Sequence, residues 1–549
     1  MGTPRSGSQS GPSDSAPSIQ QQAARIWATT WGPAWMSAIL LFAAFPPLDL
    51  WPLAWLAPCP WIALVAREKL TGRRPYLALW LAGYGFWSGA VYWIAMPYFP
   101  ATLVGLIALA FYLAFYTPVF VGLSRVAVHR FRVPLPLAVA GVWMGLEFAR
   151  AYILDGFGMV YLSHTQYRFV PLIQISDLAG AYGVSFVVMF VAGCLVQACM
   201  AATSRQRYTA VGLGGLMLAA VLGYGLVRTS GDYLQDGPRI AIVQECIEQS
   251  LRIDAQNAEE VIDKHVALSQ QAAKEKPDLI VWPETMWRYP LAVIEKDAIP
   301  PEGMKLNDLE KIRWVLMRKM QDVAHEVGRP LLLGMEFQEF GSARKPKRYN
   351  SAVMIQPSGE FTGRYNKAHR VIFGEYIPLA ESLPWLYDLS PLAGGITAGD
   401  PDQGPMQLGE RWVSPSICFE STVPHRIRRQ VQAARAAGHE ADVLVNLTND
   451  AWFWGSCQLD QHLACAIFRA VESRKPMLVS ANTGLSAAID SDGRLDWVAP
   501  RWDKAFKVVD VKLDSRASPY SHYGDWPAGL CLVATLGLAV AGWRMRKGY

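Results

Sequence analysis

A cysteine at the end of an apolar run is the first residue that could carry chemistry. Cys418 follows the run 412–417, and the pattern from 425 to 437 is typical of a helix. A side chain at such a strand-to-helix turn is exposed, and the helix N-terminus favours negative charge. The thiolate is the nucleophilic form, and a free thiol with a pKa of about 8.5 needs help to ionise. On local sequence alone, a small buried hydrophobic residue is the commoner explanation.

A glutamate and a lysine follow other apolar runs and could assist the thiol. Glu284 comes after 279–282, where a carboxylate with a pKa raised by burial could take the thiol proton. Lys367 lies close to Glu375; its ammonium could stabilise an oxyanion, and the second carboxylate could hold it in place. Taken singly, Glu284 is more often a helix cap or a loop residue, and Lys367 a surface charge. The combination with Cys418 is much more specific than any one member.

Two other features bear on function. Trp452, Phe453 and Trp454 form an aromatic run after a predicted strand; the run is either buried core or a loop that dips into a membrane or covers a site. Cys457 and Cys465 flank His462 with a Cys-x4-His-x2-Cys spacing. Zinc sites of this kind need a fourth ligand and none is in view, so we expect free thiols or a disulfide and no metal.

These residues lie in a block with the pattern of an α/β domain. The candidates for buried strands are 239–244, 279–282, 331–334, 351–355, 412–417 and 443–446. Segments 255–275 and 309–326 have the pattern of helices. Because strands and helices alternate, the block 238–513 is predicted to be α/β.

The rest of the chain has the composition of a membrane protein. Of 549 residues, 52% are hydrophobic and 18% are charged, against about 25% charged in soluble domains. Positions 32–228 hold 5 acidic and 12 basic residues, whereas 229–525 hold 40 and 34. This excludes a disordered, a collagenous, a disulfide-framework and a wholly cytosolic protein. The net charge of +5 does not indicate nucleic acid, because the excess bases lie beside apolar runs.

About eight apolar runs could cross a bilayer, where a helix needs about 20 residues. They are 35–45, 51–65, 77–98, 103–123, 134–153, 180–202, 210–227 and 526–543. The first two are short and could form a re-entrant pair. Glu147 and Arg150, near the end of the fifth run, are costly in lipid and are expected to pair.

The orientation of the chain in the membrane can be predicted from the basic residues in the loops between these runs. Bases concentrate in alternate loops and in the tail, at Arg67, Lys69, Arg73, Arg74, Arg125, Arg130, Arg132, Arg205, Arg207, Arg544, Arg546 and Lys547. The positive-inside rule places these loops in the cytoplasm and the α/β block outside it. The first twenty residues, rich in Ser, Pro, Gly and Gln, are expected to be disordered and to contain no cleavable signal peptide.

Three short motifs in order carry a family resemblance. Trp-Pro-Glu284, Tyr-Asn-Lys367 and Ile-Cys418-Phe-Glu420 resemble the nitrilase (carbon–nitrogen hydrolase) superfamily, whose catalytic set is Glu, Lys and Cys. The membrane half and the stretch 449–484 resemble one membrane branch of it, the apolipoprotein N-acyltransferase family. In the membrane half the matching features are 45–54, Trp143, Glu147, Arg150, Gly156, Phe157, Gln166 and 180–186. The resemblance covers about 42–543.

The sequence departs from the family pattern at two places. Arg370 and Ile372 replace the usual Leu and Pro of the lysine segment, while Lys367 and Glu375 remain. The stretch 243–249 lacks the usual Asn-Ile-Pro. A lipid contact near Arg252 is therefore not supported by the resemblance.

The resemblance implies a fold with two parts: a polytopic helical membrane domain of about eight spans and an extracytoplasmic nitrilase-like αββα sandwich. The expected segments are a disordered cytoplasmic N-terminus (1–32), seven membrane helices (33–228), the catalytic domain (238–513), a C-terminal transmembrane helix (526–543) and a cytoplasmic tail (544–549). The location implied is the bacterial inner membrane, with the catalytic domain on the periplasmic side.

The resemblance also implies the reaction. Cys418 would take an acyl group from a phospholipid as a thioester and pass it to the α-amine of an S-diacylglyceryl cysteine on an apolipoprotein, with no cofactor. Glu284 would be the base and Lys367 the oxyanion cation. Glu375 would orient Lys367, Glu420 would shape the site, and Trp452, Phe453 and Trp454 could contact lipid or form a lid.

Two other functions remain open on the residues. A membrane-tethered amidase would use the same Glu, Lys and Cys and pass its thioester to water. It would not need phospholipid or a platform of seven helices. A transporter or receptor with an inactive outer domain predicts paired repeats in the membrane half, and none is visible in the sequence.

Overall fold

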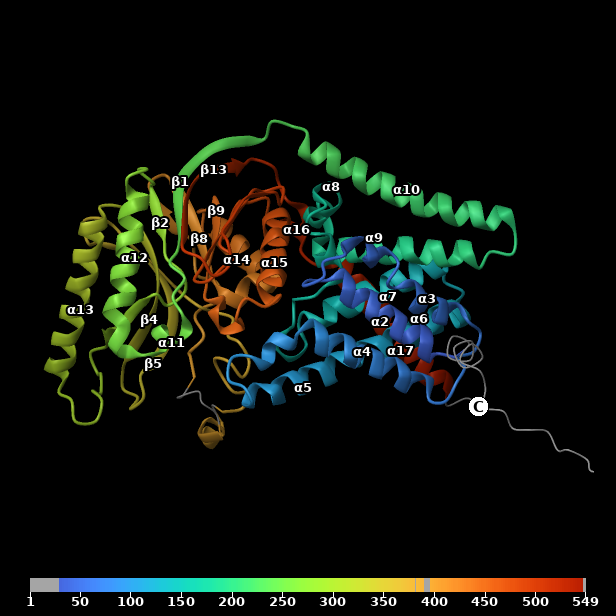
Figure 1. The fold of residues 1–549 in the computed structure, drawn as a ribbon, viewed down its shortest axis with the longest axis horizontal. Coiled ribbons are helices and arrows are strands. Elements are labelled where there is room, and N and C mark those ends of the chain that lie inside the picture. Colours follow the sequence, from blue (N-terminus) through green and yellow to red (C-terminus); the bar gives the residue numbers. More distant parts are fainter. Residues whose placement is uncertain (1–28, 381, 390–394, 547–549) are drawn as a thin grey trace, which may run out of the picture.

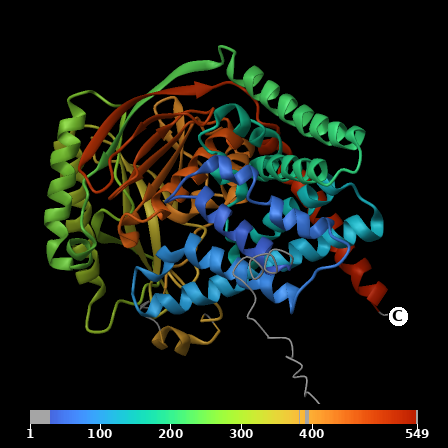
Figure 2. The ribbon, with the colours of Figure 1, turned by 45° about the vertical axis from the view of Figure 1, so that its right-hand side comes forward.

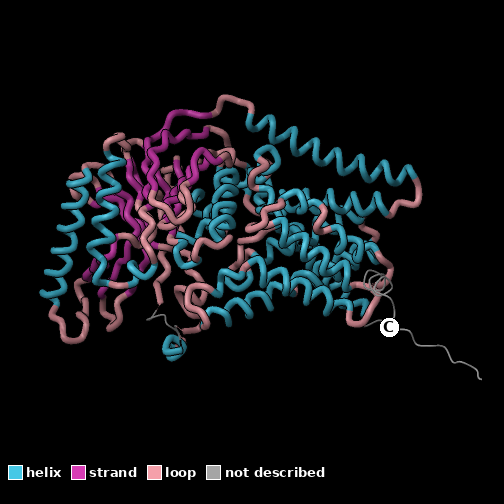
Figure 3. Tube along the Cα trace, in the orientation of Figure 1, coloured by secondary structure: helices cyan, strands magenta, loops and turns pink. Residues whose placement is uncertain are grey.

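The computed structural model describes residues 29–380, 382–389 and 395–546. Helices fill one half of the molecule, and the strands of the described chain gather in the other (Figures 1 and 3). Most of the predicted disordered N-terminus and half of the predicted tail lie outside the described residues. The two halves are joined by the long strand that follows α10 and by the segment that leads into α17 (Figure 1).

The helical half is an apolar bundle. Its main helices are α2 (Trp31–Ala44), α3 (Cys59–Ala66), α4 (Pro75–Ala90), α5 (Ala101–Ala114), α6 (Tyr116–Phe131), α7 (Leu135–Arg150), α9 (Ser176–Cys199), α10 (Ser204–Thr229) and α17 (Trp526–Arg546). Four segments are long and apolar enough to cross a membrane: 101–131, α9, α10 and α17. With 16 residues each, α4 and α7 are shorter than the about 20 residues of a full span. The eight-span count therefore stays a prediction.

The bundle has a buried centre and an apolar outside. In α9, 83% of the most apolar window is buried, whereas the figures for α10 and α17 are 22% and 11%. Large hydrophobic side chains such as Leu216 and Val533 are exposed. A long helix with an exposed apolar face is typical of contact with lipid.

The last helix closes the bundle against α7. A Cβ atom added to Gly145 of α7 would lie only 2.8 Å from the carbonyl oxygen of Cys531 in α17. The absence of a side chain at Gly145 therefore lets the two backbones approach, as small residues do in membrane helix pairs.

Two sheets form the other half. In the first, the order is β13 (Ala505–Asp514), β1 (Leu234–Gln244), β2 (Leu279–Val281), β4 (Leu331–Phe340), β5 (Lys347–Ile355) and β6 (Phe361–Asn366), and β3 (Trp287–Ile294) also pairs with β4. In the second, it is β12 (Leu495–Val498), β11 (Ala487–Ile489), β10 (Met477–Ala481), β9 (Val443–Thr448), β8 (Arg411–Ile417) and β7 (Met406–Leu408). The central pairs β1–β2–β4 and β8–β9–β10 are parallel.

The sheets stack between helices. Helices α12 (Ala258–Ala273) and α13 (Leu306–Val327) cover the first sheet, while α14 (Pro424–Ala436) and α15 (Gln458–Ser473) lie between the second sheet and the bundle (Figures 1 and 2). Along β1, Ile240 and Ile242 enter the core between the sheets, and Ala241 and Val243 enter the core that α12 covers. This alternation is the period of two of a strand buried on both faces. The predicted αββα sandwich is confirmed.

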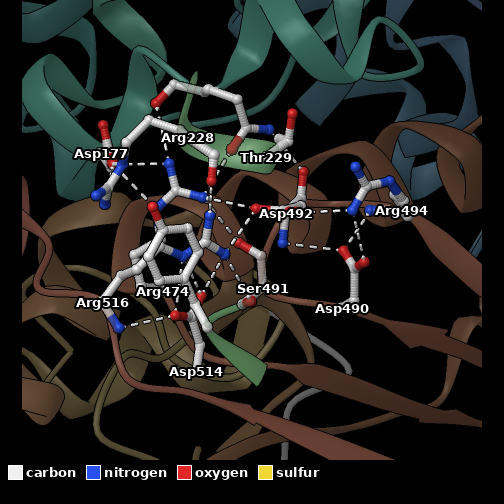
Figure 4. Close-up of polar contacts among 12 residues, drawn as sticks. Asp177, Arg228, Thr229, Arg474, Asp490, Ser491, Asp492, Arg494, Asp514 and Arg516 are labelled. Atoms are coloured by element: carbon white, nitrogen blue, oxygen red, sulfur yellow. Dashed lines mark hydrogen bonds and ion pairs between the residues drawn. The ribbon is translucent and has the colours of Figure 1, made fainter. Parts of the chain in front are cut away.

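Buried ion pairs fasten the two halves together (Figure 4). Arg474, fully buried after α15, lies 2.6 Å from Asp177 of α9 and 3.1 Å from Asp492. Asp177 also pairs with Arg228 of α10 at 2.7 Å, and Asp492 with Arg516 at 2.7 Å. Each buried charge needs its partner, because a lone buried ion is strongly destabilising. The network therefore fixes the position of the sandwich on the bundle.

The predicted pairing of Glu147 with Arg150 is wrong: no ion pair joins these two described residues. Glu147 accepts hydrogen bonds from Trp143 Nε1 at 2.9 Å and from the backbone N–H of Leu162 at 2.8 Å. Arg150 donates to the carbonyl of Val160 at 3.1 Å, and its guanidinium lies 4.8 Å from the ring centre of Trp87. The direct contacts of both charged side chains are thus with backbone and aromatic groups.

Candidate active site

The nucleophile candidate occupies a strained turn. Cys418 follows β8 directly and begins the short 3₁₀ helix η7 (Cys418–Thr422), with φ of +52°. A left-handed conformation costs a residue with a side chain about 1–2 kcal/mol, and such strain gathers at functional sites. Side-chain groups of Ser421 (3.2 Å), Asn446 (3.2 Å) and His462 (3.1 Å) surround the Cys418 carbonyl oxygen. The predicted strand-to-helix turn is present.

Glu284 lies just beyond β2 and is held on both oxygens. Its Oε1 accepts a hydrogen bond from Asn350 Nδ2 at 2.6 Å, and its Oε2 accepts one from the backbone N–H of Asn449 at 3.0 Å. The residue is 8% exposed. These two partners, 66 and 165 residues away, are contacts of a candidate catalytic residue that the sequence analysis missed, because nothing in the local sequence indicates them.

Lys367 follows β6 and lies between two carboxylates. Its Nζ is 2.7 Å from Glu375 Oε1 and 3.6 Å from Glu284 Oε1. The other oxygen of Glu375 accepts from the backbone N–H of Val371 at 2.9 Å. Only 1% of Lys367 is exposed. The fold therefore brings Lys367, Glu284 and Glu375 together and fixes the ammonium in one position.

The charges of this cluster act on the thiol. Burial raises the pKa of the Cys418 thiol well above its usual value; the Glu284 carboxylate raises it further, and the Lys367 ammonium lowers it. Burial alone would lower the pKa of Lys367, but Glu375 and Glu284 outweigh it and the net shift is upward. The resting site therefore holds a neutral thiol next to a charged ammonium. Such a thiol needs a base at the moment of attack.

Glu420 braces the nucleophile turn against the lysine segment. The residue is fully buried and accepts hydrogen bonds from Tyr365 Oη (2.9 Å), from the backbone N–H groups of Ala368 (2.8 Å) and His369 (2.9 Å), and from the N–H of Ile417 (2.8 Å). Four donors on one carboxylate fix both segments. The geometry fits the expected shaping of the site.

The nucleophile turn touches the helical half. A Cβ atom added to Gly158 would come within 2.1 Å of the carbonyl oxygen of Thr422, so only glycine allows this approach. Phe419 packs on the hydrophobic core of the bundle, and the ring of His425 stacks on Tyr152 at 4.2 Å. Cys418 therefore lies at the junction of sandwich and bundle.

The aromatic run lies at the same junction. Trp452 meets Tyr98 at 5.3 Å, and Phe453 meets Trp93 at 5.0 Å between ring centres, whereas Trp454 is 68% exposed. Two rings of the run are thus packed on the segment between α4 and α5, and the third is open to its surroundings.

Arg252 and the two cysteines around His462 occupy separate places. Arg252 donates to Thr285 Oγ1, and its guanidinium lies 5.9 Å from the ring centre of Trp452.

Among the described residues, Cys457 and Cys465 are free thiols. Cys465 Sγ faces His164 at 3.8 Å, so the three residues of the Cys-x4-His-x2-Cys spacing do not converge on one point.

Two family models match the sequence of this chain. Residues 37–194 match the apolipoprotein N-acyltransferase N-terminal domain, and residues 239–518 match the carbon-nitrogen hydrolase domain. The apolipoprotein N-acyltransferase of Geobacter metallireducens is 31% identical over 93% of this chain and 95% of its own length. That of Rhodopirellula baltica is 30% identical over 93% and 97%. A solved amidase structure from Nesterenkonia sp. AN1 is 16% identical, with a TM-score of 0.33 over 52% of this chain and 95% of the amidase, a likeness too low to support any inference. On the sequence matches, the chain belongs to the apolipoprotein N-acyltransferase family.

Proposed function

We propose that this protein transfers an acyl chain from a phospholipid to the α-amino group of the S-diacylglyceryl cysteine of apolipoproteins. The observation that carries the proposal is the cluster of Glu284, Lys367 and Cys418 at the junction with an apolar bundle. Membership of the family gives the reaction its acceptor class, because the relatives are named for apolipoprotein N-acylation.

In the first half-reaction, Glu284 takes the thiol proton while Cys418 Sγ attacks the ester carbonyl carbon of the phospholipid. Lys367 stabilises the oxyanion that forms, and Glu375 keeps the ammonium in position. The tetrahedral intermediate collapses when the C–O bond breaks, and the leaving alkoxide takes the proton back from Glu284. A thioester and a lysophospholipid result.

In the second half-reaction, the acceptor α-amine attacks the thioester carbonyl and Glu284 takes the amine proton. The C–S bond then breaks, and the proton returns to the sulfur of Cys418. The product is an amide, and the enzyme regains its thiol.

Lipid access is provided by the bundle. A small pocket in it is lined by aromatic side chains that include Phe86, Trp87 and Phe120. A low-water environment next to Cys418 would also protect a thioester from hydrolysis.

The proposed location is the bacterial inner membrane, crossed several times, with the sandwich on the periplasmic side. The orientation is supported by the basic loops, which include Arg73, Arg130 and Arg205 and lie on one side of the predicted spans. An apolipoprotein acceptor would meet the site on the opposite side.

Intact-mass analysis of the purified protein tests the proposal. Incubation with phospholipid should add one acyl group at Cys418, and the thioester should persist for minutes in the absence of an acceptor. A peptide with S-diacylglyceryl cysteine and a free α-amine should discharge it, whereas the N-acetylated peptide should not. Rapid spontaneous hydrolysis that the free-amine peptide does not accelerate would favour a tethered amidase instead.

A further inference from the structure

A buried histidine connects the nucleophile turn with the loop that carries the aromatic run. His462, on α15, is 4% exposed. Its Nδ1 lies 3.2 Å from Asp450 Oδ2, and its Nε2 lies 3.1 Å from the carbonyl oxygen of Cys418 and 2.8 Å from Ser421 Oγ. Asp450 begins the short helix η8 (Asp450–Phe453). One imidazole ring thus bridges η7 and η8.

The partners of the ring determine where its protons are. The carbonyl oxygen of Cys418 can only accept, so Nε2 carries a proton. Ser421 Oγ donates its own hydrogen to the same carbonyl at 3.2 Å and is therefore an acceptor towards Nε2. Both neighbours of Nε2 require the N–H.

The other side of the ring leads to the same conclusion. Asp450 Oδ1 accepts from Thr448 Oγ1 and from Gln458 Nε2, each at 3.2 Å. A carboxylate oxygen can only accept, so Nδ1, which faces Oδ2, also carries a proton. With both nitrogens protonated, His462 is an imidazolium.

We propose that His462 is a positioning residue for acyl transfer: as an imidazolium paired with Asp450, it holds the Cys418 carbonyl and so maintains the strained turn that aims the thiol. The part of this inference that concerns acyl transfer rests on the proposed function. The protonation of His462 and its contacts do not.

The charged surroundings of His462 are consistent with the cation. Burial lowers its pKa, but the Asp450 carboxylate, with smaller contributions from the Cys418 carbonyl and Glu284, makes the net shift upward. The titratable groups facing it are Asp450 from η8, Cys418 from η7 and Glu284 from the loop after β2. On its own helix, the nearby Cys465 faces His164 from the bundle.

The geometry predicts what happens as the pH rises through the folded-state pKa of His462. The ring keeps the proton on Nδ1, which faces a carboxylate, and loses the one on Nε2. The unprotonated Nε2 then repels the Cys418 carbonyl oxygen, and the turn loses one of the hydrogen bonds that hold it. In Asp450→Asn, the amide can instead donate to Nδ1, so the neutral ring retains the proton on Nε2.

The test is the rate of thioester formation between pH 6 and 9.5, with unfolding midpoints measured across the same range. His462→Asn should lower the maximal rate by about 10- to 100-fold, the scale of a misplaced reacting group, with little change in the KM for phospholipid. The wild-type rate should fall on the alkaline side. Asp450→Asn should lower the rate at pH 7 less than His462→Asn does and should abolish the alkaline fall, which a purely structural role of His462 would not predict. His439→Asn, a change at an exposed histidine stacked on Trp412, is the matched control and should behave as the wild type does.

The unfolding midpoints keep the inference testable without acyl transfer. A raised pKa means that the stabilisation is complete below about pH 6.5, the unfolded value, and is lost as the pH rises through the folded value. The difference in midpoint between wild type and His462→Asn should therefore shrink as the pH rises. A constant difference, a parental rate for His462→Asn, or an unchanged alkaline fall in Asp450→Asn would each overturn the assignment. Absence of thioester in the wild type would refute the proposed function alone.

Discussion

Replacing Lys367 with methionine removes a cation that lies within ion-pair distance of both Glu375 and Glu284. Methionine keeps most of the volume of the lysine stem but provides no charge or donor. Glu375 at 2.7 Å and Glu284 at 3.6 Å then face each other without a counter-ion. We expect two separable effects, one on the reaction and one on stability.

The size of each effect follows from the burial of the cluster. Loss of one oxyanion donor costs about 2.7–4 kcal/mol, or about 10²–10³ in rate. Removing one partner of a buried ion pair costs about 3–5 kcal/mol of folding free energy. Part of the second cost is avoided when a carboxyl takes up a proton, because burial and a like charge both raise a carboxyl pKa. The stability deficit should therefore shrink at low pH, while the rate does not recover.

Single-turnover thioester formation, followed by intact mass, measures the first effect, and thermal unfolding at pH 5 and pH 8 measures the second. Lys319→Met is the control: Lys319 pairs with Glu259 on the surface, where an ion pair contributes about 0–1 kcal/mol. Thioester formation by Lys367→Met at the parental rate would refute the role given to the ammonium. An equal stability deficit at both pH values would refute the account of the carboxylates.

Three further outcomes are expected. Cys418→Ala should abolish the acyl adduct and turnover, whereas Cys457→Ala and Cys465→Ala should keep most activity; activity assays of the purified variants decide this, and full turnover by Cys418→Ala would exclude the thioester. Glu284→Gln should slow thioester formation by about 10² or more, because the thiol then lacks its base, and stopped reactions analysed by mass measure it; a parental rate would remove Glu284 from the mechanism. Lys305 should react with membrane-impermeant reagents only from the periplasmic side, and labelling from the cytoplasm would reverse the orientation.

The sequence was sufficient to predict those strands and helices of the sandwich that have a regular hydrophobic pattern. The run 412–417 became β8 (Arg411–Ile417), and the segment 309–326 became α13 (Leu306–Val327). Strands with continuous β-rich runs can be predicted from their composition, and helices with one exposed face can be predicted from the period of their hydrophobic residues. The short edge strands β7, β11 and β12, with three or four residues each, are too brief to give such a signal.

The surroundings of other elements could not be predicted from the sequence, because segments far away in the chain form them. In α15, nearly every residue is buried, polar ones such as His462, Arg469 and Glu472 included, so the burial of its polar side chains could not be predicted from the helical period. Glu472 accepts from the backbone N–H of Ala181 in the bundle, a contact that only the assembled halves create. The same holds for Asn350 and its hydrogen bond to Glu284. Residue types thus indicated the candidate reacting groups and, with Glu375, a group that holds Lys367, but not the partners of Glu284.

The packing of α17 on α7 has a consequence for how the protein is made. Helix α17 follows the sandwich in the chain and fills the groove at Gly145 of α7, so this part of the bundle stays unfinished until the sandwich has been synthesised. Chains cut before Trp526 should insert their earlier helices with that groove open to lipid, and they should be substrates for membrane proteases. Supplying 519–549 as a separate peptide should rescue such a chain, because the groove is already shaped when the last helix arrives.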